Sequence, residues 1–167
     1  MRRLILLRHA KSAWDDPELP DHDRILNKRG RRSCAVIGPW LCEKGYLPDQ
    51  VLCSTAARTI ETWGLVSRSL PKPPAAMTLR DLYLASPDTM IGVLRDATGH
   101  CVALVGHNPG IGQMAEAVVA APPRHPAFSY YPTMATLIVD FPIDDWAGLM
   151  PGTGQVVDFT VPRDLGI

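Results

Sequence analysis

The chain has 167 residues, with 17 basic and 17 acidic side chains and a net charge of zero. Its length suits one domain, and 46% hydrophobic residues is typical of a globular rather than a disordered protein. The balanced charge argues against broad electrostatic binding of nucleic acid or of an anionic membrane, and no apolar run reaches the length of a membrane span. We therefore expect a single domain over 1–167, located in the cytoplasm.

Short apolar runs alternate with helical patterns along the chain. The runs at 3–7, 50–54 and 101–106 predict buried strands, because both faces of each run are apolar. Two further runs, at 134–141 and 155–161, predict strands near the C-terminus. The spacing between these runs leaves room for a helix after each of the first strands.

The first predicted helix lies between Asn27, a good N-cap, and Gly45, a good stop signal, and ends near Lys44. Pro39 falls inside this pattern and predicts a kink or an early break.

The second predicted helix is capped by Ser54 or Thr55 and runs through Leu70. Its expected apolar face also carries Ile60, Trp63 and Ser67. A third helix is capped by Ser86 and reaches about residue 98, and a fourth runs from about 109 to 120.

This strand–helix alternation predicts an α/β fold, a three-layer αβα sandwich with helices on both faces of a mostly parallel central sheet. In such sheets, ligands bind beyond the carboxyl ends of the strands. The residues that follow each strand are therefore the candidates for a functional site.

Two arginines and two histidines emerge at these strand ends. Arg8 and His9 follow the first strand, Arg58 lies at the helix start after the second, and His107 follows the third. Arginine offers a permanently charged planar fork that fits phosphate oxygens, and helix N-termini add unpaired N–H groups. A neutral imidazole can attack phosphorus. The pattern predicts a phosphoryl site.

Three motifs carry a resemblance to a known family. "LLRHAKSAW", "STAARTIET" and "LVGHNPG" resemble, in the same order, the signature motifs of the histidine phosphatase superfamily, the phosphoglycerate mutase-like proteins. The resemblance covers nearly the whole chain and is greatest to the compact bacterial SixA-like phosphohistidine phosphatases. It implies a phosphoglycerate mutase-like fold and a phosphatase that needs no cofactor and no metal.

The resemblance also implies residue roles. His9 would be the nucleophile that forms a covalent phosphohistidine. Arg8, Arg58 and His107 would hold the phosphoryl oxygens, and Ser12 falls where the family often has a phosphate-site serine. Because neighbouring arginines disfavour imidazolium, we expect a neutral His9 and an acid limb in the pH–rate profile above about pH 5.

The chain departs from the family pattern at three places. Ala10 replaces a glycine, and Asp15 stands near an asparagine of the mutase relatives. The glutamate that those relatives use as a general acid is absent from "LRDLYLASPD". Asp81 is the nearest candidate for that acid, and Asp88 is the second.

The missing glutamate bears on the substrate. An alkoxide leaving group needs a proton donor more than an imidazole does. We therefore expect the substrate to be a phosphohistidine on another protein, of the histidine-relay type. The short segment at 70–82 also implies an open site, and whether 121–133 acts as a lid is left open, as is the oligomeric state. Alternatives are a phosphatase of small esters such as sugar phosphates and a non-catalytic phosphate-binding module.

Competing interpretations are weaker. Cys53 and Arg58 resemble the phosphate loop of cysteine phosphatases, but the spacing is one residue too short. A metal-dependent phosphatase would place arginines beside a dication. Arg58 alone would be a surface arginine that pairs with Glu61 or Asp81.

The remaining cysteines and histidines have plainer interpretations. The four cysteines are expected to be free, buried thiols, and solvated loop positions are expected for His22, His100 and His125. The basic run "KRGRR" at 28–32 is expected to be a solvated helix face that can attract an acidic partner.

Overall fold

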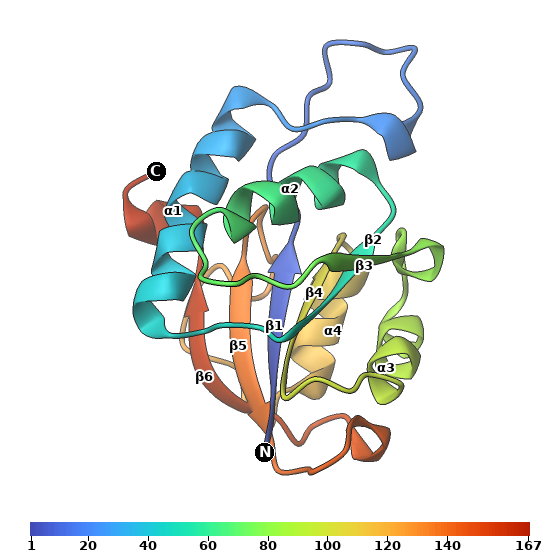
Figure 1. Ribbon diagram of the computed structural model, residues 1–167, viewed down its shortest axis with the longest axis vertical. Helices are drawn as coiled ribbons and strands as arrows, with labels where there is room; N and C mark the ends of the chain where they lie inside the picture. The colour runs from blue at the N-terminus through green and yellow to red at the C-terminus, as the bar shows by residue number, and fades with distance from the viewer.

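One six-stranded sheet organises the computed structural model, which describes all residues 1–167 (Figure 1). The strand order is β3-β2-β4-β1-β5-β6. The strands are β1 (Arg2–Arg8), β2 (Gln50–Ser54), β3 (Ala76–Leu79), β4 (Cys101–Gly106), β5 (Thr136–Phe141) and β6 (Gln155–Thr160). Strands β1 to β4 run parallel, whereas β5 is antiparallel to both β1 and β6. The predicted, mostly parallel sheet is confirmed.

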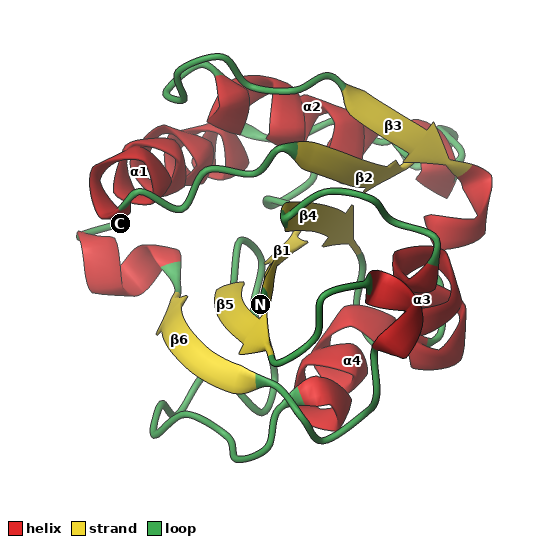
Figure 2. Cartoon of the chain, turned by 60° about the horizontal axis from the view of Figure 1, so that its bottom comes forward, coloured by secondary structure: helices red, strands yellow, loops and turns green.

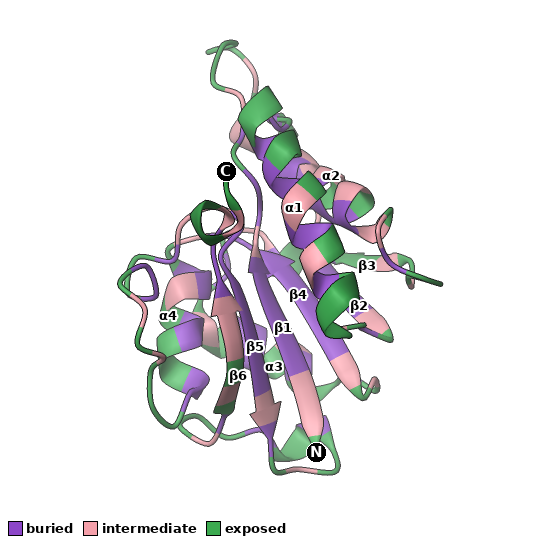
Figure 3. Cartoon of the chain, turned by 90° about the vertical axis from the view of Figure 1, so that its left-hand side faces the viewer, coloured by how far each residue is buried: buried purple, intermediate pink, exposed green.

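Four helices form the two outer layers (Figure 2). They are α1 (Lys28–Lys44), α2 (Ala57–Ser67), α3 (Pro87–Arg95) and α4 (Gly110–Val118). Apolar side chains of α1 and α2 join one core cluster with one face of the sheet, and those of α3 and α4 join a second cluster with the other face. The central strands are buried while the outer helix surfaces are exposed (Figure 3). The predicted three-layer sandwich is therefore confirmed.

The bounds of α1 follow the predicted signals. The Asn27 side chain accepts a hydrogen bond from the Gly30 amide at 2.8 Å, and Gly45 takes a left-handed conformation at the other end. The helix continues through Pro39, so the expected break does not occur. Pro39 is exposed, while Ile37 and Leu41 on either side of it are buried, so core packing holds the helix together across the lost hydrogen bond.

Helix α2 differs from its prediction. It begins at Ala57 without a side-chain cap and ends at Ser67, three residues before the predicted end. Ile60 is exposed, and the buried side includes Thr59, Thr62 and Val66 in addition to Trp63. The predicted face is thus right for Trp63 and Leu70 and wrong for Ile60. Thr59 and Thr62 are turned inward because their hydroxyls bond to the backbone of Ser54 and Ala10 at the strand ends.

The other elements are close to expectation. Ser86 caps α3 as predicted, but this helix ends at Arg95. Helix α4 follows a cis peptide bond between Asn108 and Pro109. The edge strand β3 was not predicted. No helix of the molecule has both the length and the apolar character that a membrane crossing requires.

Candidate active site

The carboxyl ends of β1, β4 and β2 meet at one edge of the sheet, as the strand order requires. Arg8 is in register with Gly106, and the His9 amide donates to the Gly106 carbonyl at 3.1 Å. His107 follows immediately, and its ring centroid lies 5.2 Å from that of His9. Both imidazoles are buried. The two histidines predicted from separate strands therefore face each other.

His9 is held in one tautomer by its neighbour. Its Nδ1 lies 2.6 Å from the Ala10 carbonyl oxygen, which can only accept, so Nδ1 carries the proton. The Ala10 amide in turn donates to the Thr62 hydroxyl at 3.0 Å, which fixes this turn to α2. Nε2 is left with a free lone pair. Burial, and then the charges of Arg58 and Arg8, lower the pKa of His9 to about 4 despite the opposing Ala10 hydrogen bond.

His107 is fixed by the end of β2. Its Nε2 lies 2.8 Å from the Ser54 hydroxyl, whose oxygen accepts from the Ala56 amide. Burial, and then the neighbouring His9, lower the pKa of His107 to about 3. Its Nδ1 is buried without a hydrogen-bond partner. Because an unpaired buried polar atom is costly, this nitrogen is well suited to bind a ligand oxygen.

Arg8 is anchored by a neutral group. Its Nη1 donates to the Tyr131 carbonyl at 3.0 Å, and its Nε is buried without a partner. Burial and then the charge of Arg58 lower the pKa of Arg8. A guanidinium remains charged even so.

The segment that holds Arg8 is a fixed wall of the site rather than a free loop. Tyr131 is fully buried, and its carbonyl, with that of Tyr130, also accepts from the Asn108 side chain at 3.0 Å. The Met134 amide approaches the Arg8 and His9 carbonyls at 3.2 Å. These bonds tie 130–134 to the strand end that carries the catalytic candidates.

Arg58 is anchored by an acid that the sequence did not single out. Its side chain is buried and donates to the Asp21 backbone carbonyl at 2.7 Å and to the Asp21 carboxylate at 3.0 Å. The Tyr83 hydroxyl donates to the same carboxylate oxygen. Partial burial raises the pKa of Asp21, but the hydrogen bonds from Tyr83 and Arg58 outweigh it and lower that pKa.

The alternative surface pairing of Arg58 is therefore wrong. Glu61 instead accepts from the Leu26 amide at 2.9 Å and from Arg31 at 2.8 Å. Asp81 is exposed and forms no ion pair.

His22 also belongs to the edge of this site. Its Nε2 lies 2.8 Å from the Thr55 hydroxyl, and its ring meets Tyr83 edge-on at 4.8 Å between centroids. Tyr83 contacts His107 in the same way at 5.4 Å.

The solvated loop position expected for His100 is confirmed, since this residue is exposed, whereas His22 and His125 are partly buried, and all three have side-chain partners. Besides the Thr55 contact of His22, His100 bonds to Arg2 at 2.6 Å, and His125 bonds to Asp164 at 2.8 Å. These partners are distant in sequence, so only the fold brings them together.

The other predicted site residues lie outside this cluster of contacts. Ser12 is buried, and its backbone bridges to Leu26. Asp81 lies exposed in a short 3-10 turn, and Asp88 lies exposed in the first turn of α3. Asp15 is exposed as well. The structure thus brings Arg8, His9, Arg58 and His107 together and leaves the candidate acids at the surface.

The competing chemistries find little support in the site. Burial raises the pKa of the Cys53 thiol to about 12, so the thiolate that a cysteine phosphatase needs is absent near neutral pH. No group of three or more histidine, cysteine, aspartate and glutamate side chains is arranged to hold a metal ion. The arrangement instead offers an imidazole lone pair surrounded by donors and positive charge, which suits a tetrahedral oxyanion.

Comparisons with known proteins agree with this chemistry. The model of the histidine phosphatase superfamily, branch 1, matches residues 4–83. An uncharacterised protein of Mycobacterium tuberculosis is 33% identical over 164 residues, covering 94% of this chain and 100% of that protein. An uncharacterised chloroplast protein of Arabidopsis thaliana is 54% identical over 61 residues, which span 36% of this chain and 28% of that protein.

A solved structure is similar to this one over nearly the whole chain. The Agrobacterium tumefaciens protein assigned as the phosphohistidine phosphatase SixA is 28% identical and superposes with a TM-score of 0.79, covering 96% of this chain and 98% of that one. With the paired histidines and arginines at the sheet edge, these similarities show that the chain belongs to the histidine phosphatase superfamily, as a phosphatase of the SixA-like type.

Proposed function

We propose that this phosphatase removes the phosphoryl group from phosphohistidine on another protein, through a covalent intermediate on His9. The observation that carries the proposal is the state of His9: its Nδ1 proton is committed to the Ala10 carbonyl, and its pKa is lowered to about 4. Nε2 is therefore an unprotonated nucleophile near neutral pH, under the influence of the charges of Arg58 and Arg8 and with the ring of His107 5.2 Å from its own ring.

The proposed reaction has two steps. In the first, His9 Nε2 attacks phosphorus while Arg8, Arg58 and His107 hold the phosphoryl oxygens, and the P–N bond of the substrate breaks as its imidazole takes up a proton. In the second, water attacks the phosphorylated His9, releases inorganic phosphate and restores the free imidazole. Ser12 is proposed as an additional phosphate ligand.

The proton donor is proposed to be Asp81, with a small contribution. Its exposed position allows water to take over this role, and a departing imidazole is basic enough to accept a proton from solvent. We expect Asp81→Asn to lower kcat several-fold at most for a phosphohistidine substrate. A loss of about a hundred-fold or more, the scale of full general-acid catalysis, would mean that Asp81 and not solvent protonates the leaving imidazole.

Three observations support a protein substrate. The chain from the end of α2 to the start of α3 spans only 68–86 and holds the edge strand β3 and one 3-10 turn, so it builds no additional domain over the site. The 130–134 segment is held by hydrogen bonds as a fixed wall of the site, and not as a free loop that would cover it. The Agrobacterium protein assigned as the phosphohistidine phosphatase SixA matches this chain over nearly its whole length. The four free cysteines further support our proposal of a reducing, cytoplasmic location.

The decisive experiment traps the phosphoenzyme. A histidine-relay domain carrying 32P-phosphohistidine is mixed with the enzyme and quenched within milliseconds, and the enzyme is separated from the substrate. We expect base-stable, acid-labile label on the wild type and none on His9→Ala. His100→Ala, an exposed histidine that contacts Arg2 away from the site, is the matched control and should retain the label.

The same assay tests the substrate class. A panel of sugar phosphates is run beside the relay domain, and we expect kcat/KM to be at least a hundred-fold higher for the relay domain. A preference for a sugar phosphate would replace the proposed substrate while leaving the His9 chemistry intact. Label that persists on His9→Ala would overturn the mechanism, and phosphate binding without turnover would indicate a binding module.

A further inference from the structure

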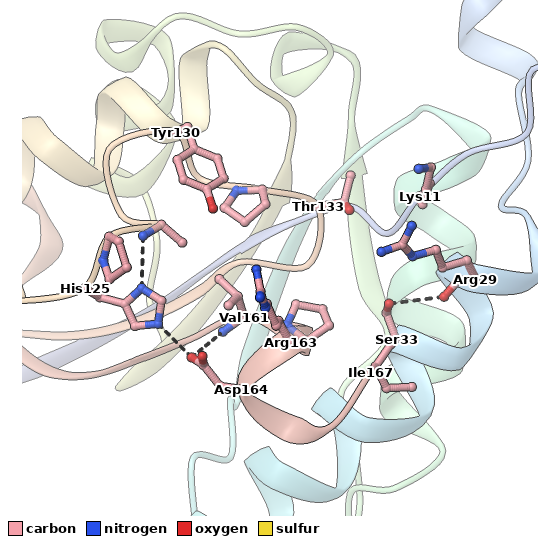
Figure 4. Close-up of a pocket in the computed structure, with 14 residues that line it drawn as sticks. Lys11, Arg29, Ser33, His125, Tyr130, Thr133, Val161, Arg163, Asp164 and Ile167 are labelled. Carbon is pink, nitrogen blue, oxygen red and sulfur yellow. Dashed lines mark hydrogen bonds and ion pairs between the residues drawn. The ribbon is translucent and has the colours of Figure 1, made fainter.

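A second hollow lies beside the proposed active site, where 125–133 and 161–164 meet the start of α1 (Figure 4). Its volume is about 610 Å³. The four central candidates, Arg8, His9, Arg58 and His107, do not line it. We call it the basic groove because Lys11, Arg29 and Arg163 line it, with Lys11 and Arg29 on one side and Arg163 between them and His125 (Figure 4).

The side chains of the groove carry more positive than negative charge. Lys11, Arg29 and Arg163 are exposed, and none of the ion pairs in the molecule includes them. Asp164 supplies the one side-chain carboxylate of the lining. It is already engaged, since it accepts from His125 at 2.8 Å and from the Val161 amide at 3.4 Å. The groove therefore carries three unpaired cations toward solvent.

The N-terminus of α1 adds to the positive potential of the groove, although basic residues at this position do not stabilise the helix. Acidic residues near a helix N-terminus are stabilising, and basic ones are not. The first turn of α1 contains no acid and begins instead with Lys28 and Arg29. The helix thus adds its own positive end to the groove, and the local sequence cannot be explained by helix stability.

The groove is fastened to the active site on both sides. On one side, Lys11 lies two residues after His9, and its carbonyl accepts from the Asn27 amide at 3.0 Å. Gly30 lets α1 approach so closely that a side-chain carbon at this position would overlap the Lys11 carbonyl oxygen. On the other side, the wall that includes Tyr130 continues into Tyr131, which holds Arg8.

We infer that the basic groove binds an acidic segment of the phosphorylated protein substrate, next to the phosphohistidine that enters the active site. This inference rests on the proposed function and identifies the kind of protein that is recognised. Unpaired cations attract a carboxylate-rich surface, and the exposed ring of Tyr130 offers an aromatic contact at the rim. Because none of Arg8, His9, Arg58 and His107 lines the groove, we expect it to affect protein substrates and not a small phosphate ester.

A binding experiment tests the groove independently of catalysis. Fluorescence anisotropy measures the affinity of a labelled deca-glutamate peptide for the full chain. Charge reversal in Arg29→Glu/Arg163→Glu should weaken binding at least about ten-fold. The control Lys44→Glu/Arg68→Glu reverses two exposed cations outside the groove with the same change in net charge, and should alter affinity less than two-fold. An absence of binding to the wild type, or an equal loss in both double variants, would overturn the inference.

A kinetic experiment then links the groove to the substrate. For the phosphorylated relay domain, Arg29→Glu/Arg163→Glu should lower kcat/KM about ten-fold, mainly through KM, while hydrolysis of p-nitrophenyl phosphate stays unchanged. Unchanged kcat/KM for the relay domain would overturn the docking role. If the wild type leaves the relay domain phosphorylated, the proposed function fails, and the peptide experiment still decides whether the groove binds acidic segments.

Discussion

The two arginines of the site are held in opposite ways. Arg8 rests against a neutral carbonyl, that of Tyr131, and keeps its full charge available. Arg58 rests against the carboxylate of Asp21, which Tyr83 also holds. We therefore expect the charge of Arg8 to be fully available to phosphate in the resting enzyme, and that of Arg58 to be partly offset by Asp21 until phosphate binds.

This difference shows how the site accommodates the two positive charges of Arg8 and Arg58. Each of the two guanidinium groups lowers the pKa of the buried His9, and Arg58 lowers that of Arg8. Asp21 relieves part of this repulsion from the solvent side, where its carboxylate is cheap to keep ionised. Arg8 has no acidic partner, so we expect it to stabilise the transition state more than Arg58 does.

The largest expected effect is the loss of activity when one of the two arginines is replaced by alanine. We expect Arg8→Ala to lower kcat/KM about a thousand-fold and Arg58→Ala about a hundred-fold, because the uncompensated cation contributes more to a phosphoryl transition state. Steady-state kinetics with p-nitrophenyl phosphate measures both, and thermal unfolding confirms that each variant is folded. A larger loss for Arg58→Ala would reverse the assignment of the two roles.

The next largest effect concerns Asp21, the acid that pairs with Arg58. We expect Asp21→Asn to tighten the inhibition constant of inorganic phosphate about three- to ten-fold, because a charge that competes with phosphate for Arg58 is removed. Asp15→Asn, an exposed acid of the same loop, is the control and should leave the constant unchanged. Weaker phosphate binding in Asp21→Asn would show that Asp21 orients Arg58 more than it competes for it.

The smallest expected effect concerns pH. With the pKa of His9 lowered to about 4, the residue stays neutral from pH 7 to about pH 5 and protonates only below that range. The acid limb expected above about pH 5 from the sequence is therefore moved downward by burial. NMR titration of the His9 ring, assigned with His9→Asn, should show less than a tenth of full protonation at pH 5. A midpoint near 6.5 would contradict the structure.

The strand ends were predictable because both the apolar runs and the polar residues after them are local features. β2 and β4 begin and end where the sequence indicated, and the same runs placed Arg58 and His107 at the ligand edge. Parallel pairing then brings their carboxyl ends together without further information. The positions of His9, both arginines and the second histidine could thus be predicted from short segments.

The supporting residues were not predictable, for physical reasons. Asp21 and Tyr83 meet Arg58 from loops 37 and 25 residues away in the chain, and neither loop has a periodic pattern that fixes its path. β3 is a short edge strand whose side chains are half-buried or exposed, so it lacks the apolar run that reveals a central strand. Thr55 looked like a helix cap but instead bonds to His22.

The burial of Cys53 bears on how sensitive the enzyme is to oxidation. Enzymes that use a thiolate against phosphorus are inactivated by hydrogen peroxide, because the same low pKa that makes the sulfur reactive exposes it to oxidation. Here the Cys53 sulfur is fully buried and protonated near neutral pH, and burial likewise raises the pKa of Cys34 and Cys101 to about 12. Cys42 is exposed, so the expectation of four buried thiols is wrong for this residue. If His9 rather than a cysteine attacks phosphorus, we expect this phosphatase to keep its activity at peroxide concentrations that inactivate cysteine-based phosphatases.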